Sequence, residues 1–238
     1  MEIDFFNIDA VLFSMDGVIY DNKELTFRLI LSDIFHAKWI KKDIEVRKAL
    51  QGTDFETSES FYASYFEKMS QECHTSKEKY RIRYFTKFLP NMCNTLKDYY
   101  SYREGLDDIF LQLKRNEIPF LIYSDYVFAK ERGNAIGLQD IDYKNFLCLD
   151  EIGCQKPAPR GFKEIENLII YKKAFYGNIL VVSTDDKVDK ECAKNAGFTF
   201  LKINDDEISS SQEDEMSWDD FITKFSNALR QKTVQKSH

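Results

Sequence analysis

Residues 10–22 read AVLFSMDGVIYDN, and this stretch decides the fold. Four apolar residues, 10–13, run into Ser14–Gly17. A short apolar run that ends in a glycine turn is typical of a buried strand that leads into a loop. Ligands of open α/β sheets bind at the ends of such strands. We therefore expect the loop that starts at Ser14 to be the organising point of a site.

The composition limits the class of protein. The chain has 238 residues, of which 43% are hydrophobic, so it can build one large domain or a core domain with a smaller cap. A net charge of -7 argues against nucleic acid as a partner. The sequence holds no apolar run of about 18 residues, which argues against a membrane span.

The N-terminus and the cysteines indicate a cellular compartment. The first ten residues, MEIDFFNIDA, are too polar for a signal peptide. The five cysteines are scattered, odd in number and without a CxxC pair, which is typical of reduced thiols. We therefore predict a cytoplasmic protein.

Residues 23–98 have the pattern of a helical segment. Their apolar residues recur at spacings of three and four, which predicts about four helices with breaks near 52–54 and 74–76. The segment is rich in Tyr and Phe, a composition more typical of packing than of a ligand site. Four aromatic residues could face a ligand, although we expect them to be packing residues: Tyr20, Phe27, Tyr62 and Tyr65.

After Gly105 the pattern changes to alternating helices and strands. The predicted strands are PFLIYSD, NFLCLDE, NILVVSTDD and FTFLKI, and helical patterns separate them. This alternation predicts βαβ units and a parallel sheet. The expected fold is α/β, with a doubly wound, Rossmann-like parallel sheet and an all-helical cap inserted after the first strand. We assign residues 1–21 and 99–238 to the core and residues 22–98 to the cap.

The C-terminal region contributes three smaller predictions. The acidic stretch from Asp205 to Glu215 is expected to be a solvated connection. Ser217 is a candidate N-cap for a C-terminal helix, and the tail QKTVQKSH is expected to fray.

Four strand ends carry the polar residues on which chemistry could depend. They read FSMDG from Phe13, YSD from Tyr123, IGCQKPAP from Ile152, and VSTDD from Val182 with Asp189 following. Each is a weak signal alone, because serines and aspartates commonly cap or turn the chain. Their joint order and spacing are far more specific.

Together these stretches resemble the four motifs of the haloacid dehalogenase (HAD) superfamily, most members of which are phosphohydrolases. The run EIGCQKPAPRGFKEI is similar to the neighbourhood of its third motif, and DKECAKNAGFTFLKI to the segment that follows its fourth. A helical insertion between motifs one and two is what its subfamily I, with a helical C1 cap, would have. The resemblance extends from about residue 8 to residue 203.

The resemblance implies a reaction and assigns roles to residues. In an active member, a carboxylate at the end of the first strand attacks phosphorus and forms an aspartyl phosphate. A second carboxylate two residues later is the general acid and base, which is Asp16 here. A hydroxyl and a lysine hold the phosphoryl oxygens, and they match Ser124 and Lys156. Gly17 and Asp125 adjoin these groups in the implied phosphate pocket.

The resemblance also implies Mg²⁺ as a cofactor. The acidic fourth motif matches Asp185 or Asp186, together with Asp189, and Asp16 would complete the metal ligands. The glycine that usually precedes the acid is absent. Counting back from Gly197 allows Asp185 or Thr184 at the position of the acid, and we prefer Asp185 because Mg²⁺ needs a carboxylate.

Ser14 is where the match to the family fails, because it stands at the position of the nucleophilic aspartate. A serine hydroxyl lacks the charge of a carboxylate and needs an adjacent base to attack. The three histidines, His36, His74 and His238, offer no such base on sequence grounds. The change also removes one carboxylate from the implied metal site, which weakens metal binding without forbidding it.

Three interpretations of function therefore remain open at this stage. The first is a HAD-like protein with lost or strongly weakened aspartyl-phosphate chemistry that keeps a phosphate-binding pocket. The second is an active Mg²⁺-dependent phosphatase that uses Asp16 or an activated water. The third is an engineered nucleophile variant of such an enzyme. The expected ligand is a small phosphorylated molecule or free phosphate, the first interpretation also leaves a protein partner open, and none of the three fixes the oligomeric state.

Overall fold

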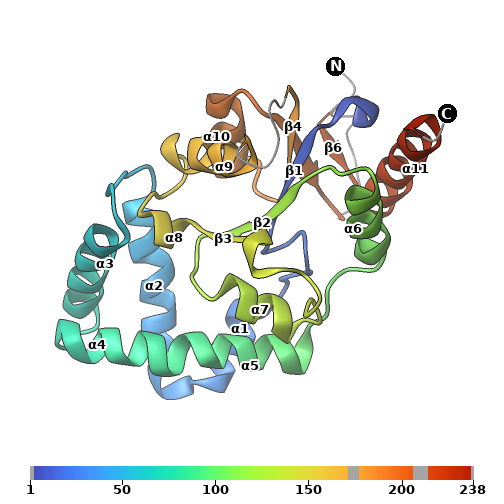
Figure 1. The fold of residues 1–238 in the computed structure, drawn as a ribbon. Helices are drawn as coiled ribbons and strands as arrows, with labels where there is room; N and C mark the ends of the chain where they lie inside the picture. Colours follow the sequence, from blue (N-terminus) through green and yellow to red (C-terminus); the bar gives the residue numbers. More distant parts are fainter. Residues whose placement is uncertain (1–2, 171–176, 206–213, 237–238) are drawn as a thin grey trace. The chain divides into compact units, whose positions relative to one another are not determined.

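The structure is a computed structural model, and it describes residues 3–170, 177–205 and 214–236 (Figure 1). Strands of these residues form one sheet in the order β3-β2-β1-β4-β5-β6. The strands are β1 (Ala10–Ser14), β2 (Phe120–Ser124), β3 (Phe146–Cys148), β4 (Ile179–Ser183), β5 (Thr199–Ile203) and β6 (Glu215–Met216). This is the predicted α/β, Rossmann-like parallel fold, which is confirmed.

β1 lies between β2 and β4 and pairs with both in parallel. Val11 lies beside Phe120 on one side, and Ala10 lies beside Ile179 on the other. The chain adds β2 and then β3 on one side of β1, and returns to add β4, β5 and β6 on the other side. The strand order therefore reverses between β1 and β4, and ligands of open α/β sheets bind at such a reversal point.

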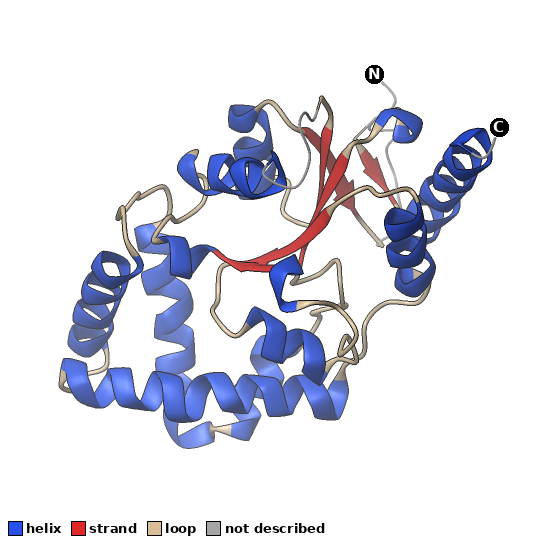
Figure 2. Ribbon diagram, in the orientation of Figure 1, coloured by secondary structure: helices blue, strands red, loops and turns tan. Residues whose placement is uncertain are grey.

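Helices cover both faces of this sheet (Figures 1 and 2). α6 (Leu106–Arg115) and α11 (Trp218–Lys236) lie on one face, and α9 (Arg160–Ile170) and α10 (Val188–Ala196) lie on the other. The Phe13 ring contacts Phe110 of α6 and Phe221 of α11. On the opposite face, Tyr123 contacts Phe162 of α9. Every residue of β1 and β4 is buried, as expected for strands covered on both faces.

The predicted helical insertion follows β1 and precedes β2, and it is confirmed (Figure 2). Its elements are α1 (Leu25–Ser32), η2 (Ile34–His36), α2 (Ala37–Leu50), α3 (Ser58–Glu72), α4 (Lys77–Arg83), the π-helical η3 (Tyr84–Phe88) and α5 (Leu89–Tyr99). Three of the four aromatic residues expected to pack do so: Tyr65 stacks on Phe61, Tyr62 stacks on Phe66, and the Tyr20 ring contacts Tyr100 edge-on. Phe27 is 59% exposed, so the prediction is wrong for that residue.

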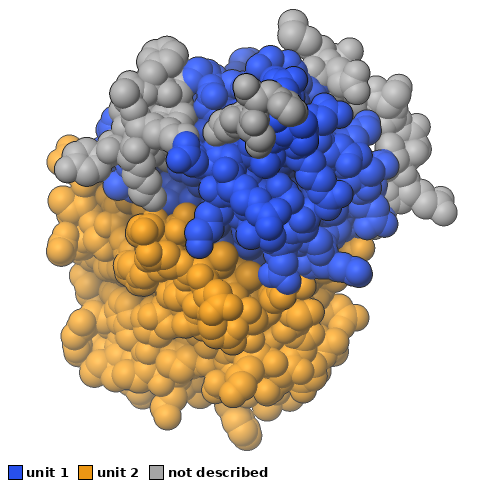
Figure 3. Space-filling model, turned by 45° about the vertical axis from the view of Figure 1, so that its right-hand side comes forward, with its two compact units in different colours: residues 1–19, 103–123, 162–238 blue, residues 20–102, 124–161 orange. Residues whose placement is uncertain are grey.

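The chain forms two compact units, coloured separately in Figure 3. The first comprises residues 1–19, 103–123 and 162–238, and the second comprises residues 20–102 and 124–161. The second unit thus contains the predicted helical segment and also residues 124–161, which include α7 (Ala129–Ala135), η4 (Tyr143–Asn145) and α8 (Leu149–Ile152). The domain boundaries drawn from the sequence, 22–98 against the rest, stay a prediction.

Local predictions differ from the structure at a few places. The predicted strand NFLCLDE is strand only over Phe146–Cys148, because Leu149–Ile152 turn into α8. The tail predicted to fray is helical as far as Lys236 in α11. Ser217 does cap this helix, since its Oγ accepts from the Asp220 amide at 3.1 Å. Much of the acidic stretch and His238 lie outside the described residues, and the two-residue strand β6 and η1 (Phe5–Asn7) had not been predicted.

Candidate functional site

Ser14 is the last residue of β1 and lies at the carboxyl end of this central strand, where the strand order reverses. Its neighbour in β2 is Tyr123, whose carbonyl accepts from the Met15 amide at 2.9 Å. The Ser14 side chain is 8% exposed, and its hydroxyl donates to the Asp16 carbonyl at 3.4 Å. The hydroxyl is therefore directed to the backbone of its own turn, and this contact does not activate it as a nucleophile.

The loop after Ser14 is fixed by contacts within the first unit. Gly17 has φ +88°, and a Cβ placed there would lie 2.5 Å from Oγ1 of Thr184. Its carbonyl accepts from Nη2 of Arg103 at 2.8 Å, and Nη1 of the same guanidinium pairs with Asp205 at 2.5 Å. The loop therefore meets the end of β4 at a point where only glycine fits. Asp16 is half-buried in this loop.

The fourth-motif carboxylates lie after β4, and each is held by other groups. Oδ1 of Asp185 accepts from the amides of Lys187 and Val188, at 2.9 and 2.8 Å, where α10 begins. Asp186 pairs with Lys202 at 3.1 Å, and this hydrogen bond lowers the pKa of the carboxyl. Asp189 is 1% exposed. It accepts from the hydroxyls of Tyr123 and Ser183 at 2.8 and 2.6 Å.

These three carboxylates are among the residues predicted to bind Mg²⁺. The Asp189 carboxylate is hydrogen-bonded in the core, Asp186 forms an ion pair, and Asp185 accepts from amides at the start of α10. Ser14 supplies no carboxylate. Among the residues that the structure describes, no three His, Cys, Asp or Glu side chains are grouped to hold a metal ion. The three carboxylates after β4 do not fit a preformed magnesium centre in this arrangement. We assign no step to a metal, and magnesium dependence stays a prediction to test.

Ser124 lies in the second unit with a buried arginine that the sequence analysis had missed. Ser124 is 3% exposed, and its Oγ accepts from Nη1 of Arg132 at 2.7 Å and from the Tyr126 amide at 3.2 Å. Arg132 is 1% exposed and also donates to the hydroxyl of Tyr20 at 3.0 Å. Arg132 lies in α7, within a run of polar residues that gives no sign of a buried charge.

Lys156 and Asp125, both predicted site residues, lie close together in the second unit. The Lys156 Nζ is 3.3 Å from Oδ2 of Asp125. The side chain of Lys156 is 11% exposed, and that of Asp125 is 37% exposed. The second unit therefore brings together three of the predicted site residues through two neighbouring turns, 124–126 and 153–156.

A buried ion pair lies behind these turns. Arg47 of α2 donates to both oxygens of Asp150, at 3.1 and 2.8 Å, and Asp150 is 0% exposed. Burial raises the pKa of Asp150 to about 6, although the charge of Arg47 opposes the shift. The sequence had offered no signal for this pair because its partners are 103 residues apart.

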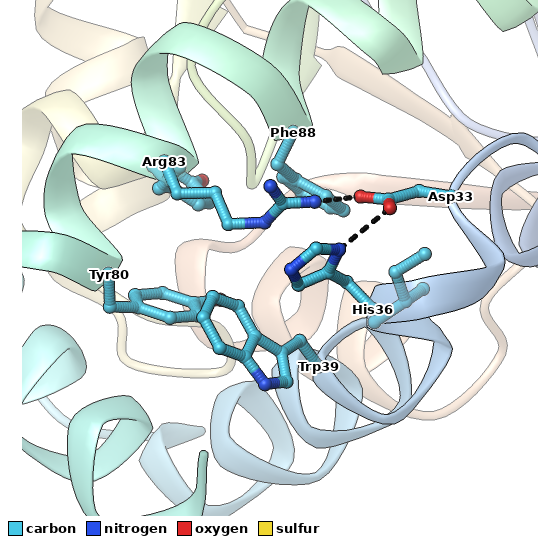
Figure 4. A pocket seen from close by; sticks show the side chains of 8 residues that line it. Asp33, His36, Trp39, Tyr80, Arg83 and Phe88 are labelled. Carbon is cyan, nitrogen blue, oxygen red and sulfur yellow. Dashed lines mark hydrogen bonds and ion pairs between the residues drawn. The ribbon is translucent and has the colours of Figure 1, made fainter. Parts of the chain in front are cut away.

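The helical segment also contains a small hollow, shown in Figure 4. Asp33 pairs there with Arg83 and with Nδ1 of His36, and the Trp39 ring packs against His36. The hollow measures about 20 Å³, which is room for about one water molecule. A surface groove of about 400 Å³ shares Asp33 and Arg83 with it. Neither cavity is lined by a predicted site residue.

Comparison with known proteins was made by sequence and by fold. No protein-family model and no curated protein sequence matches the chain. Solved structures do match it, and those described here are HAD-superfamily hydrolases. The fold is that of the haloacid dehalogenase hydrolases.

Three of these structures illustrate the range of the similarity. A HAD hydrolase of family IA, variant 3, from Entamoeba histolytica is 17% identical, with a TM-score of 0.58 over 94% of this chain and 100% of its own. A HAD family hydrolase from Deinococcus radiodurans, with bound phosphate and sodium, is 14% identical, with a TM-score of 0.53 over 95% and 96%. L-2-haloacid dehalogenase from Xanthobacter autotrophicus is 16% identical, with a TM-score of 0.52 over 87% and 80%.

At these identities the similarity concerns the fold. It does not fix the reaction, since one of the three similar proteins is a dehalogenase. None of the helices that the structure describes combines the length and the apolar character that a membrane crossing requires.

The contact between Gly17 and Thr184 gives a prediction about stability. Gly17→Ala is expected to lower the free energy of unfolding by about 1 kcal/mol or more beyond the cost of the positive φ alone, because the new Cβ overlaps Thr184. Gly197→Ala is the matched control, because Gly197 has φ +77° but no neighbour within 4 Å. Urea titration of both variants measures the difference, and equal losses would contradict the assigned contact.

The raised pKa of Asp150 predicts a pH dependence of stability. The stabilising contribution of protonated Asp150 is complete below its ordinary value of 3.8 and is lost as the pH rises through about 6. The unfolding free energy of the wild type, relative to Asp150→Asn, should therefore fall by about 2 kcal/mol between pH 4 and pH 7. Denaturant titrations across this range test it, and a difference independent of pH would contradict the assignment.

Proposed function

We propose that this protein is a HAD-fold phosphate-binding protein whose aspartyl-phosphate hydrolysis is lost or strongly weakened. Its ligand is a small phosphorylated molecule or free phosphate. The observation that carries this proposal is Ser14, which ends β1 at the reversal point of the sheet and directs its hydroxyl to the Asp16 carbonyl. A hydroxyl so placed has neither the charge nor the base that attack on phosphorus requires.

In the part of the chain that the structure describes, no hydrogen bond joins the Ser14 hydroxyl to an imidazole or a carboxylate. Among the described residues, His36 pairs with Asp33, and His74 lies at a turn with φ 50°. The Asp16 contact of Ser14 uses the backbone carbonyl of Asp16. Proton transfer from Ser14 therefore has no evident acceptor, which supports a loss of nucleophilic chemistry.

The groups that bind phosphate are retained better than the nucleophile. The Lys156 side chain is 11% exposed and pairs with Asp125, and Ser124 has a fixed position beside the buried guanidinium of Arg132. Replacing an aspartate by Ser14 also removes one negative charge that would repel a phosphate dianion. The bound phosphate in the similar hydrolase from Deinococcus radiodurans is consistent with a phosphate ligand in this fold.

Restoring the carboxylate tests the proposal. Wild-type protein is expected to hydrolyse p-nitrophenyl phosphate in Mg²⁺ far below ordinary enzyme rates of about 1–10³ s⁻¹. Ser14→Asp should raise turnover by about 100-fold or more, because it returns the nucleophile to its strand end. Ser14→Asn is the matched control, because it has a similar size without the charge and should give no gain.

Two outcomes would favour a different function. Turnover by the wild type at ordinary enzyme rates would refute the proposal. If Asp16→Asn then abolished that turnover, an active phosphatase that uses Asp16 would be the better interpretation. If Ser14→Asp shows no gain in turnover, Ser14 is not the cause of the low activity, and the observation that carries the proposal is overturned.

Metal removal gives a separate prediction. Phosphate affinity of the wild type should change less than twofold when Mg²⁺ is replaced by EDTA, because the assigned donors are Lys156 and Ser124. Titration calorimetry with inorganic phosphate measures the affinity. Loss of phosphate binding in EDTA would show that a metal is part of the wild-type site.

A further inference from the structure

We propose that Arg47 is a positioning residue, which holds the two turns that carry Ser124 and Lys156 in one fixed arrangement. The inference rests on the proposed function, because it concerns the same phosphate-binding residues. All of its contacts lie within the second unit. Arg47 itself lies in α2, and its guanidinium donates to Asp43, Tyr84 and Asp150, so its hydrogen bonds are made to other residues of the unit.

The turn that carries Lys156 is bound along its length to the segment between α2 and α3. The Gly52 amide donates to the Lys156 carbonyl at 2.9 Å, and the Gln155 amide donates to the Thr53 carbonyl at 3.0 Å. The Phe55 amide donates to the Gly153 carbonyl at 2.8 Å. The position of Lys156 therefore follows the position of the end of α2.

Gly153 shows how close this approach is. A Cβ at Gly153 would lie 2.1 Å from the carbonyl oxygen of Thr57, just before α3. Only glycine allows the two backbone segments to run this close together, and φ is +73° at this residue. The turn is thus packed against the backbone of the helical segment without intervening side chains.

The other turn is bound to α2 through Tyr126. The Tyr126 hydroxyl donates to Oδ2 of Asp43 at 2.7 Å, and its backbone amide donates to Oγ of Ser124 at 3.2 Å. The Arg47 guanidinium lies 3.9 Å from the centre of the Tyr126 ring, within range of a cation–π interaction. Asp43 also pairs with Nε of Arg47 at 3.2 Å.

Arg47 closes these contacts into a ring. It donates to both oxygens of Asp150, and Oδ1 of Asp150 accepts from Nε2 of Gln155 at 2.9 Å. Lys156 follows Gln155 and pairs with Asp125, which precedes Tyr126. We call this closed set the contact ring: Arg47, Asp150, Gln155, Lys156, Asp125, Tyr126 and Asp43.

Fixing the positions of the two turns explains the contact ring better than a contribution to stability does. A buried ion pair often contributes no more to stability than well-packed apolar residues would, because desolvation offsets the attraction. Its hydrogen bonds nevertheless demand one geometry, whereas apolar contacts tolerate several. A ligand site needs such accuracy, since a shift of about 1 Å in a donor is enough to weaken it. The contact ring fixes the turns of Ser124 and Lys156 through their contacts with α2.

Tyr126→Phe tests the contact ring by deleting a single oxygen atom. It removes the hydrogen bond to Asp43 and keeps the aromatic side chain of residue 126 beside Arg47. Tyr80→Phe is the matched control, because it deletes a buried hydroxyl of the same unit that reaches Asp43 only through Tyr65 and makes no direct contact with the contact ring. We expect Tyr126→Phe to shift the amide NMR signals of Gln155 and Lys156 in the full-length, ligand-free protein, and Tyr80→Phe to leave them in place.

Phosphate affinity is the second measurement. Tyr126→Phe should weaken the binding of inorganic phosphate by about 3- to 10-fold, and Tyr80→Phe by less than twofold. If Tyr126→Phe does not fold, Asp43→Asn weakens the contact ring at the same place, because it keeps the shape of the side chain and removes the charge that faces Tyr126 and Arg47. Unchanged signals of Gln155 and Lys156 in the folded variant would overturn the proposal.

The two measurements separate this inference from the proposed function. If the wild type does not bind phosphate, the proposed function fails, while the amide signals still decide whether the ring positions the two turns. If the wild type binds phosphate and both tyrosine variants weaken it equally, the ring has only a general structural role and the positioning proposal is wrong.

Discussion

The parallel pairing of β1 with β2 and β4 is the constraint on which the rest of the structure depends. The sheet can add strands in one direction from β2 and in the other from β4 only because β1 stands between them. That reversal leaves the end of β1 free of a covering crossover helix, so a loop can begin there. All five residues of β1 are buried, and Phe13 in particular joins the strand to α6 and α11. Strand pairing therefore fixes where position 14 lies, and this does not depend on the side chain there.

Elements with strong local patterns could be predicted from the sequence. β1, β2, β4 and β5 are short apolar runs bounded by turns, and the helical insertion has regular spacing of apolar residues. β6 could not be predicted, because two residues carry no period and their pairing depends on β5. Part of α8 was predicted as strand, since Leu149 continues the apolar run of Phe146–Cys148 and the turn there depends on tertiary contacts. The strand ends that carry the candidate site were identified, but the partners of their side chains were not.

Those partners show which candidate carboxylates also stabilise the fold. Asp189 accepts hydrogen bonds from two buried hydroxyls, and Asp185 accepts from amides at the start of α10, so both carboxylates stabilise the end of β4 whether or not a metal binds. The described hydrogen bond of the Ser14 side chain, in contrast, reaches only the backbone of its own turn. Position 14 is therefore the candidate site residue whose described side-chain contacts depend least on the rest of the core.

Arg47 illustrates the opposite case, a charge that sequence pattern alone suggests is solvated. It lies in α2 among lysines and glutamates, KKDIEVRK, where a reader of the sequence would place it on the surface. Burial of Arg47 is possible only because Asp43, one turn earlier, and Asp150, far along the chain, both face it. Desolvation of these groups costs free energy that the ion pair only partly returns, as the raised pKa of Asp150 indicates. Since apolar side chains could fill the same space at lower cost, the retained polar contacts are best explained by the fixed geometry that they impose on the turns beside them.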